Sequence, residues 1–341
     1  MVDVTVRGAG IFGLSVAWAC ALRGARVRVV DPFGVAAGAS GGLVGALAPH
    51  VPENWNDKKD FQFRALVRAE AFWEEVSAIS SVDPGYARTG RLQPLADDHA
   101  VELAQQRAKT AQELWGPRFS WSVTSDVGRF APHSPTGLWI HDNLSARLHP
   151  RKATQALAMA LQAKGTEIVQ DAPTQGAEVW ATGVHDLDAM SAAAGRTLGN
   201  GVKGQAALLK FDAPHAPQLF GDALHLVPHA DGTLAIGSTS ERSYDNPTQT
   251  DDQLDDVLTR AVAVCPALAT APVLARWAGV RPRARSRAPV LGHHPMRDGA
   301  YIANGGFKIG FGIAPEVGEV MAELILNQCN TIPQSFAPEA L

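Results

Sequence analysis

Three glycines near the N-terminus, and one aspartate after them, have the types and spacing of a dinucleotide-binding turn. Gly8, Gly10 and Gly13 form a GxGxxG pattern, and Asp31 follows 18 residues after Gly13. The first glycine would make the tight turn, the second would let the backbone approach a pyrophosphate, and the third would let a helix pack closely on a strand. The helix N-terminus would face the phosphates, and the aspartate would accept a hydrogen bond from a ribose hydroxyl.

The elements around these glycines are the ones that such a turn requires. Residues 2–6 alternate and are β-branched, which predicts a strand, and the segment LSVAWACALR predicts a buried helix that ends at Gly24. The segment ARVRVVD predicts a second strand that carries Asp31 at its end. The sequence therefore predicts an adenine-dinucleotide site. The acidic residue suits NAD or FAD and disfavours NADP, whose 2′-phosphate it would repel.

Residues 34–49 favour a flavin over a nicotinamide cofactor. They are small, rich in glycine and almost uncharged, so the chain could lie flat against a large planar ring, although a surface loop would look the same. The chain has one nucleotide motif, and its C-terminal glycine-rich turn also suits a flavin. An NAD-linked dehydrogenase is accordingly the least favoured enzyme class.

Composition bounds the remaining possibilities. A length of 341 residues predicts roughly two domains, and 46% hydrophobic with 19% charged residues excludes a disordered chain. The net charge of −4 gives no sign of a nucleic-acid or anionic-membrane surface. Three cysteines far apart predict neither a disulfide framework nor a metal site. The longest apolar stretch, residues 8–22, is too short to span a bilayer, so we expect a cytoplasmic enzyme without membrane contact.

Hydrophobic periodicity predicts the other elements. Helices are expected over 60–80, 97–115, 150–163 and 251–264, and a strand over 177–183. Residues 223–239 predict a hairpin with an Ala-Asp-Gly turn. Near the end, GAYIANGG predicts a strand, followed by a helix with Ala314 and Pro315 in its first turn. Strand–turn–helix units at both ends of the chain indicate an α/β fold whose domains are interleaved.

Several motifs, taken in their order along the chain, resemble the FAD-dependent D-amino-acid oxidase superfamily, especially glycine oxidase and sarcosine-oxidase-like members. The resemblance spans nearly the whole chain, and its motifs are GAGIFGLSVAWACALRGARVRVVD, GASGG, VWATG, LHLVPHADGTLAIGST, WAGVRPRARSRAPVLG and YIANGGFKIGFGIAPEVG. The stretch GASGGLVGALAPHVPENWNDKKDFQFRALVRAEAFWEEV also resembles the FAD domain of the bacterial bifunctional enzyme that modifies tRNA wobble uridines.

The resemblance implies a Rossmann-type, glutathione-reductase-like FAD-binding domain and an interleaved α+β substrate domain built on an antiparallel sheet that covers the flavin. The FAD-binding domain is expected over 1–83, 141–196 and 274–341, and the substrate domain over 84–140 and 197–273. Such a flavoprotein binds FAD non-covalently and oxidises the C–N bond of a small amino acid or N-alkyl amino acid. Hydride passes to the flavin, the imine is hydrolysed, and O₂ or another acceptor takes the electrons.

The resemblance also assigns residues. Arg281 matches the arginine that binds the substrate carboxylate, Lys308 matches a second basic residue, and His225 stands where glycine oxidases carry a tyrosine. No cysteine lies near Arg281 or Lys308 in the sequence, which disfavours a covalent flavin link. The positions that match the cofactor site are Gly8, Gly10, Ile11, Phe12, Gly13, Asp31, Pro32, Ser40, Gly41, Gly42, Thr182, Gly183, Gly305, Gly306, Phe307, Lys308, Gly310 and Gly312.

The chain departs from the family pattern at several places. His225 is either a hydrogen-bonding or proton-relaying group or a structural residue. Ser286 replaces an acidic residue, and Arg283, Arg285 and Arg287 beside it would either hold a polyanionic substrate or form a solvated basic loop. The segment between Lys164 and Ala177 is short, so we expect the β-meander of the relatives to be trimmed.

The tryptophans pose a separate question. Trp277, four residues before Arg281, is the best candidate for an aromatic wall of a substrate pocket, with Trp55 and Trp180 as further candidates. Packing in the core is the alternative for all of them.

Two other functions stay open. One is removal of the modification from a carboxymethylaminomethyl tRNA base, against which the net charge of −4 argues. The other is a flavoprotein subunit that needs a partner protein and oxidises no free amine.

Overall fold

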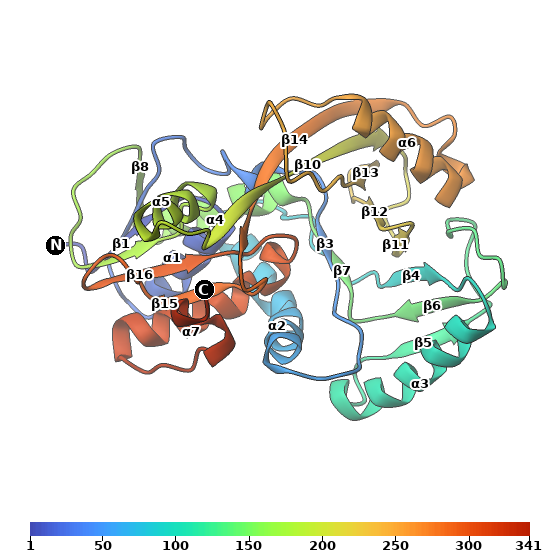
Figure 1. The fold of residues 1–341 in the computed structure, drawn as a ribbon, viewed down its shortest axis with the longest axis horizontal. Coiled ribbons are helices and arrows are strands. Elements are labelled where there is room, and N and C mark those ends of the chain that lie inside the picture. The colour runs from blue at the N-terminus through green and yellow to red at the C-terminus, as the bar shows by residue number, and fades with distance from the viewer.

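The computed structural model describes residues 1–341 and contains two large sheets (Figure 1). The first has six strands in the order β15-β16-β9-β1-β2-β8, of which only β15 runs antiparallel to its neighbour. Its strands are β1 (Val4–Arg7), β2 (Val27–Val30), β8 (Glu167–Val169), β9 (Ala177–Trp180), β15 (Val290–His293) and β16 (Ala300–Asn304). Because parallel strands need crossover connections, this sheet is built from three distant parts of the chain.

Helices cover the parallel sheet, namely α1 (Ile11–Leu22), α2 (Asp57–Ser80), α4 (Pro150–Ala163), α5 (Val184–Ala194) and α7 (Gly310–Asn327). Within this group α1 packs on α7, and α2 packs on both α7 and α4. The close approach of α1 and α7 depends on Gly318, where a β-carbon would lie 2.5 Å from the carbonyl oxygen of Ser15. The largest hydrophobic core of the molecule gathers here, around Leu14, Trp18 and Trp73.

The second sheet has eight strands in the order β14-β10-β13-β12-β11-β4-β6-β5, and it is antiparallel except for the pair β11–β4. Its strands are β4 (Arg91–Pro94), β5 (Trp121–Thr124), β6 (Trp139–Asp142), β10 (Gly199–Lys210), β11 (Gln218–Gly221), β12 (Leu224–Pro228), β13 (Thr233–Gly237) and β14 (Val273–Ala284). Helix α6 (Asp252–Val264) shares a second hydrophobic core with it, and α3 (Asp98–Trp115) packs beside β5.

The long strands β10 and β14 lie side by side at one edge of the antiparallel sheet and run from the region of the parallel sheet toward α6 (Figure 1). A short sheet of β3 (Ala46–Leu47) and β7 (Ala146–Arg147) lies between the two large ones (Figure 1). Successive segments of the chain thus enter the parallel and the antiparallel sheet in turn. Together with the helices, this arrangement confirms the predicted α/β class. The exact domain boundaries stay a prediction.

Most predicted elements agree with the structure. The hairpin is formed by β12 and β13, and α4 and α6 begin one residue after His149 and Asp251. Helix α2 starts at residue 57 rather than 60, because Asn56 caps it by accepting hydrogen bonds from Lys58 and Lys59. No strand lies between β8 and β9, in line with the expected shortening of that segment.

The prediction for the last helix was wrong at its start. Helix α7 begins at Gly310, so Pro315 lies in its second turn and not in the first. The Ile313 N–H donates to the Ile309 carbonyl at 3.1 Å, so the first turn of the helix is closed before Ala314 and Pro315. The missing N–H of Pro315 removes one helical hydrogen bond, which the buried packing of α7 offsets.

No helix of the protein is long and apolar enough to cross a membrane.

Candidate active site

A cavity of about 1140 Å³ is lined by residues from both large sheets. Small-molecule sites usually occupy about 300–1,000 Å³, so this cavity has room for a large ligand and a smaller one beside it. It extends from the carboxyl ends of β1, β2 and β9 to the inner strands of the antiparallel sheet. The predicted dinucleotide turn lies at the first end, and Arg281 lies at the other.

The N-terminal glycine turn is packed too tightly for side chains. Gly8 has a φ of +110°, and a β-carbon there would overlap the carbonyl oxygen of Ala181 after β9. A β-carbon at Gly13 would overlap the carbonyl oxygen of Gly8. Both glycines therefore lie behind the cavity, where they hold β1, β9 and α1 together.

The N-terminus of α1 faces the cavity without a side-chain cap. Gly10 is the capping residue, and the first turn carries no acidic residue. The Ile11 N–H donates to Ser40 Oγ at 2.9 Å, and Gly10, Ile11 and Ser40 all line the cavity. Ser40 thus takes the Ile11 N–H, and the other N–H groups of the first turn, at the positive end of the helix dipole, make a site for a phosphate group.

Asp31 lies directly after β2 on the same cavity wall. One of its carboxylate oxygens accepts the Ala9 N–H at 2.8 Å, and the other accepts the Phe33 N–H at 2.9 Å. These bonds fix the carboxylate in place, and each oxygen keeps a free lone pair. A ribose hydroxyl of a bound dinucleotide could donate to it.

At the other end of the cavity Arg281 projects from β14. Its Nη1 donates to Ser238 Oγ at 2.8 Å, and its Nη2 donates to the carbonyls of Thr239 and Lys203 at 2.7 and 3.3 Å. Its Nε is buried and has no acceptor. No carboxylate pairs with the guanidinium, and burial lowers the pKa of Arg281 to about 10. A buried cation without an acid partner is costly, so this site favours an anionic ligand.

Lys308 and His225 lie near Arg281. The lysine keeps access to solvent, but partial burial and the charge of Arg281 lower its pKa. Burial, together with the charges of Arg91 and Lys308, lowers the pKa of His225 to about 3. The imidazole of His225 is therefore neutral at physiological pH, and its Nδ1 has no hydrogen-bond partner. It can exchange hydrogen bonds with a ligand but does not carry charge near pH 7.

Trp277 forms part of the wall between the two ends of the cavity. If Gly42 carried a β-carbon, that atom would lie 3.4 Å from the indole ring of Trp277. A β-carbon on Gly279 would overlap the same ring. Phe220 packs on His225 with ring centroids 4.7 Å apart. The indole of Trp277 thus lines the cavity. From the sequence alone, this position and packing in the core were both possible.

All but four of the sequence-predicted site residues line this cavity. The four others are Gly8, Gly13, Gly41 and Gly312. Gly41 accepts a hydrogen bond from Arg151 through its carbonyl, and Gly312 lies within α7 beside Leu66. Gly312 is thus too far along the helix to face the ligand space.

Sequence reasoning missed Arg297. This residue lies in the turn between β15 and β16, and its guanidinium carbon is 3.6 Å from the ring centroid of Trp180. Both residues line the dinucleotide end of the cavity, and Nε of Arg297 is buried without an acceptor. No local motif marks such a residue, because only the fold brings the turn to the end of β9. The loop residues Tyr244, Pro247 and Thr248 were missed for the same reason.

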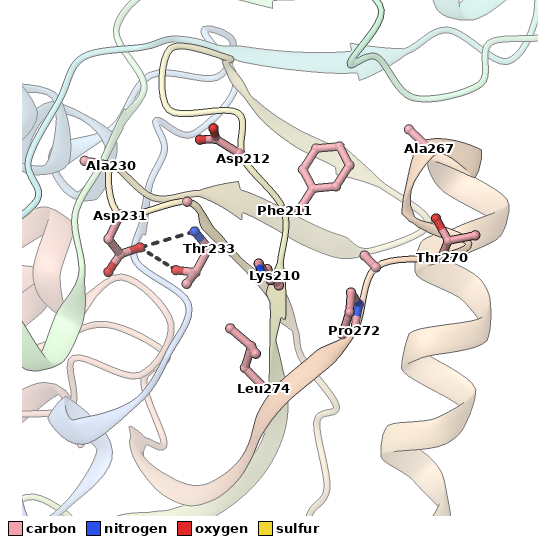
Figure 2. Close-up of a pocket in the computed structure, with 12 residues that line it drawn as sticks. Lys210, Phe211, Asp212, Ala230, Asp231, Thr233, Ala267, Thr270, Pro272 and Leu274 are labelled. Atoms are coloured by element: carbon pink, nitrogen blue, oxygen red, sulfur yellow. Dashed lines mark hydrogen bonds between the residues drawn. The ribbon is translucent and has the colours of Figure 1, made fainter.

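A second cavity, of about 910 Å³, lies at the far ends of β10, β13 and β14 (Figure 2). Its carboxylate Asp231 already accepts hydrogen bonds from the N–H and the hydroxyl of Thr233, and it pairs with Lys152 at 2.7 Å. None of the predicted site residues lines it. The large cavity, which contains most of the predicted site residues, is therefore the better candidate for an active site.

Comparisons with known proteins agree with this geometry. Residues 3–324 match the model of a protein family described as FAD dependent oxidoreductase. The chain is 27% identical to the glycine oxidase of Pseudomonas putida, over 99% of this chain and 98% of that protein. It is also 27% identical to the bifunctional protein ThiO/ThiG of Synechocystis sp., over 99% of this chain but 54% of the relative, so it spans about half the length of that protein.

Solved structures show the same fold. The glycine oxidase from Geobacillus kaustophilus superposes on the chain with a TM-score of 0.84 at 20% sequence identity. The superposition covers 98% of this chain and 97% of that structure.

Proposed function

The chain belongs to the family of FAD-dependent oxidoreductases, and from this premise we propose that it oxidises the C–N bond of a small amino acid or N-alkyl amino acid of the glycine, sarcosine or D-amino-acid type. One observation carries the proposal. The same cavity that the dinucleotide turn adjoins ends at the partly buried guanidinium of Arg281, which has no acid partner. The named activities of the relatives in Pseudomonas putida and Geobacillus kaustophilus support this substrate class.

The residues present suit FAD. The uncapped N-terminus of α1, with Gly10 and Ser40, would hold the pyrophosphate, and Asp31 would hold the adenosine ribose. Helix α7 also begins at the cavity, at Gly310, without a side-chain cap, and its dipole would stabilise negative charge on the flavin pyrimidine. None of the three cysteines lines the cavity, which supports non-covalent binding. When bound, FAD supplies the acceptor for a hydride.

The protein's own residues would bind and orient the substrate. Arg281 would take the substrate carboxylate through the part of its guanidinium that lines the cavity, with Lys308 as a second cation nearby. No carboxylate stands beside these cations to hold an ammonium group. Their field therefore favours the neutral amine, whose lone pair forms the C=N bond as the hydride leaves the α-carbon. His225, being neutral, would exchange a hydrogen bond with the bound substrate.

The reaction balances as a two-electron oxidation. The substrate loses a hydride from carbon and a proton from nitrogen, and water then hydrolyses the imine to a carbonyl compound and ammonia, or an amine where the substrate is N-alkylated. Bound FAD would supply the acceptor for the two electrons, which O₂, giving hydrogen peroxide, or another acceptor would finally take.

The absorption spectrum of the purified protein tests this function. We expect a yellow protein that bleaches when it is mixed anaerobically with glycine, sarcosine or a D- or L-amino acid. Fast recolouring in air would indicate an oxidase, and slow recolouring a dehydrogenase. A yellow protein that no free amine bleaches would overturn the proposal in favour of a tRNA-base substrate or a partner-dependent flavoprotein.

A further inference from the structure

Three cationic side chains surround the ring of Phe307 beside the substrate end of the cavity. Arg281, Lys308 and Phe307 line the cavity, and Arg283 lies next to it on β14 without lining it. The guanidinium carbons of Arg281 and Arg283 lie 5.5 and 5.6 Å from the ring centroid of Phe307, and Nζ of Lys308 lies 5.9 Å from it. The two arginines are two residues apart on β14 and therefore share one face of the strand. The Phe307 N–H donates to the carbonyl of Pro282 at 3.1 Å, which fixes the ring beside that face.

This cationic cluster, made of Arg281, Arg283 and Lys308, has no acidic counterpart. None of its three members takes part in an ion pair of the protein. Glu241 is the acid whose charge reaches Arg281, and it is already paired with Lys203, whose Nζ lies 3.3 Å away. His225 beside the cluster is neutral at physiological pH. The carboxylate of a simple amino acid would neutralise one of the three charges and leave two.

The next two arginines after Arg283 in the sequence do not belong to the cationic cluster. Arg285 and Arg287 follow on the same segment, but both are exposed, and neither lies over the Phe307 ring. Arg283 is half-buried, so part of its hydration shell is replaced by protein. A partly desolvated cation gains more from an anionic ligand than a fully solvated one does.

We propose that Arg283 and Lys308 form a second anion subsite beside Arg281, so that the preferred substrate is an amino acid with a second carboxylate within a few bonds of its amine. This inference rests on the proposed function, because it takes Arg281 as the site of the first carboxylate. A neutral group in the second position would leave two cations unpaired, and the site would therefore discriminate against it by charge more than by size.

Matched substrates test the subsite. N-(carboxymethyl)glycine and N-(carbamoylmethyl)glycine differ by a carboxylate against an amide of the same shape, and aspartate and asparagine form a second such pair in either configuration. We expect kcat/KM to favour the diacid by about tenfold or more in at least one pair. The preference should fall below about threefold in Arg283→Gln and weaken as salt is added. Arg285→Gln is the matched control and should keep the wild-type preference.

A binding experiment separates this inference from the proposed function. Thiodiacetate and (methylthio)acetate have sulfur in place of the amine nitrogen, and their affinities can be measured by the change in flavin absorbance. We expect thiodiacetate to bind about tenfold more tightly to the wild type and the advantage to vanish in Arg283→Gln. If glycine or sarcosine bleaches the flavin but both diacid preferences stay within about threefold, the subsite is wrong and the function stands. If no amine bleaches the flavin, the function fails, and equal affinities for the two thioethers would overturn the subsite as well.

Discussion

The guanidinium of Arg281 lies across Gly204 on the neighbouring strand β10, where a β-carbon on residue 204 would overlap Nη2 of the arginine. Gly204 pairs with Gly279, so two glycines face each other at this point of the β10–β14 ladder. The missing side chain at 204 provides the space in which the arginine side chain lies, although Gly204 itself does not line the cavity.

Gly204→Ala should displace the end of the Arg281 side chain without unfolding the sheet, because the overlapping atom is the tip of a flexible side chain. We expect KM for carboxylate substrates to rise about tenfold or more, with kcat less affected. Steady-state kinetics with the best amine substrate would measure this. Gly128→Ala is the control, since a β-carbon there meets nothing within 4 Å. An unchanged KM in Gly204→Ala would show that the position of the arginine does not depend on this glycine.

Arg281→Ala should weaken the binding of any carboxylate substrate by about 2–5 kcal/mol, the cost of removing one partner of a desolvated charge pair. The variant should still bind FAD, because the arginine lies away from the dinucleotide turn. Stopped-flow reduction over a range of substrate concentrations would give the apparent Kd directly. Normal kinetics in this variant would contradict the assignment of Arg281 to the carboxylate.

Arg297→Gln should lower the affinity for FAD. The guanidinium stacks on Trp180 at the dinucleotide end of the cavity, and its buried Nε has no acceptor in the protein. We expect the Kd of FAD to rise by about tenfold, measured by fluorescence titration of the apoprotein. Arg129→Gln, at an exposed arginine without an ion pair, should bind FAD like the wild type. Equal affinities in the two variants would exclude a role for Arg297 in holding the cofactor.

His225→Gln should reduce kcat/KM by about tenfold, because a hydrogen bond to a charged substrate contributes about 1.5 kcal/mol or more. The pH profile should keep its shape between pH 6 and 9. The reason is that the imidazole has a pKa of about 3 in the folded protein and does not titrate in that range. If kcat/KM of the wild type changed with pH around pH 6.5 and this change were lost in the variant, the ring would work as an acid or base.

Acid should destabilise the protein through a second, buried histidine. His229 is 1% exposed, neither ring nitrogen has a partner, and its ring lies 4.8 Å from that of His149. Burial, with the charges of His149 and Arg147, lowers the pKa of His229 to about 4 against the opposing effect of Asp231. The unfolded chain takes up the proton near pH 6.5, so stability is complete above that pH and falls as pH drops toward 4.

The loss from His229 is on the order of 3 kcal/mol over that range. Thermal unfolding at pH 7.5, 6 and 5 should show Tm falling with pH in the wild type and falling less steeply in His229→Gln. His99→Gln, at an exposed histidine on α3, should keep the wild-type slope. Parallel slopes in all three proteins would show that the burial of His229 does not govern acid stability.

The sequence by itself determined the dinucleotide turn and most of the secondary structure. Gly13 takes its predicted packing position because a strand–turn–helix unit is a local structure, in which a β-carbon at 13 would overlap the carbonyl of Gly8. Gly8 also makes the predicted turn, but the carbonyl that excludes a side chain there belongs to Ala181, a long-range contact. Asp31 follows β2 as predicted, and its binding to a ribose stays a prediction. The hairpin of β12 and β13 and the caps of α4 and α6 are local in the same way as the packing of Gly13. The starts of α2 and α7 were misplaced, because the Asn56 cap of α2 and the first helical hydrogen bond of α7, from Ile313 to Ile309, were not apparent from the sequence.

The tertiary structure alone decided which charges meet. Arg281, Arg283 and Lys308 come from a strand and a turn that the sequence treats separately, and their convergence on Phe307 requires the pairing of β14 with β10 and the turn after β16. The placement of Arg297 on Trp180 and the neutral state of His225 have the same origin. Burial and the distances between charges depend on long-range packing, and a sequence pattern carries no record of them.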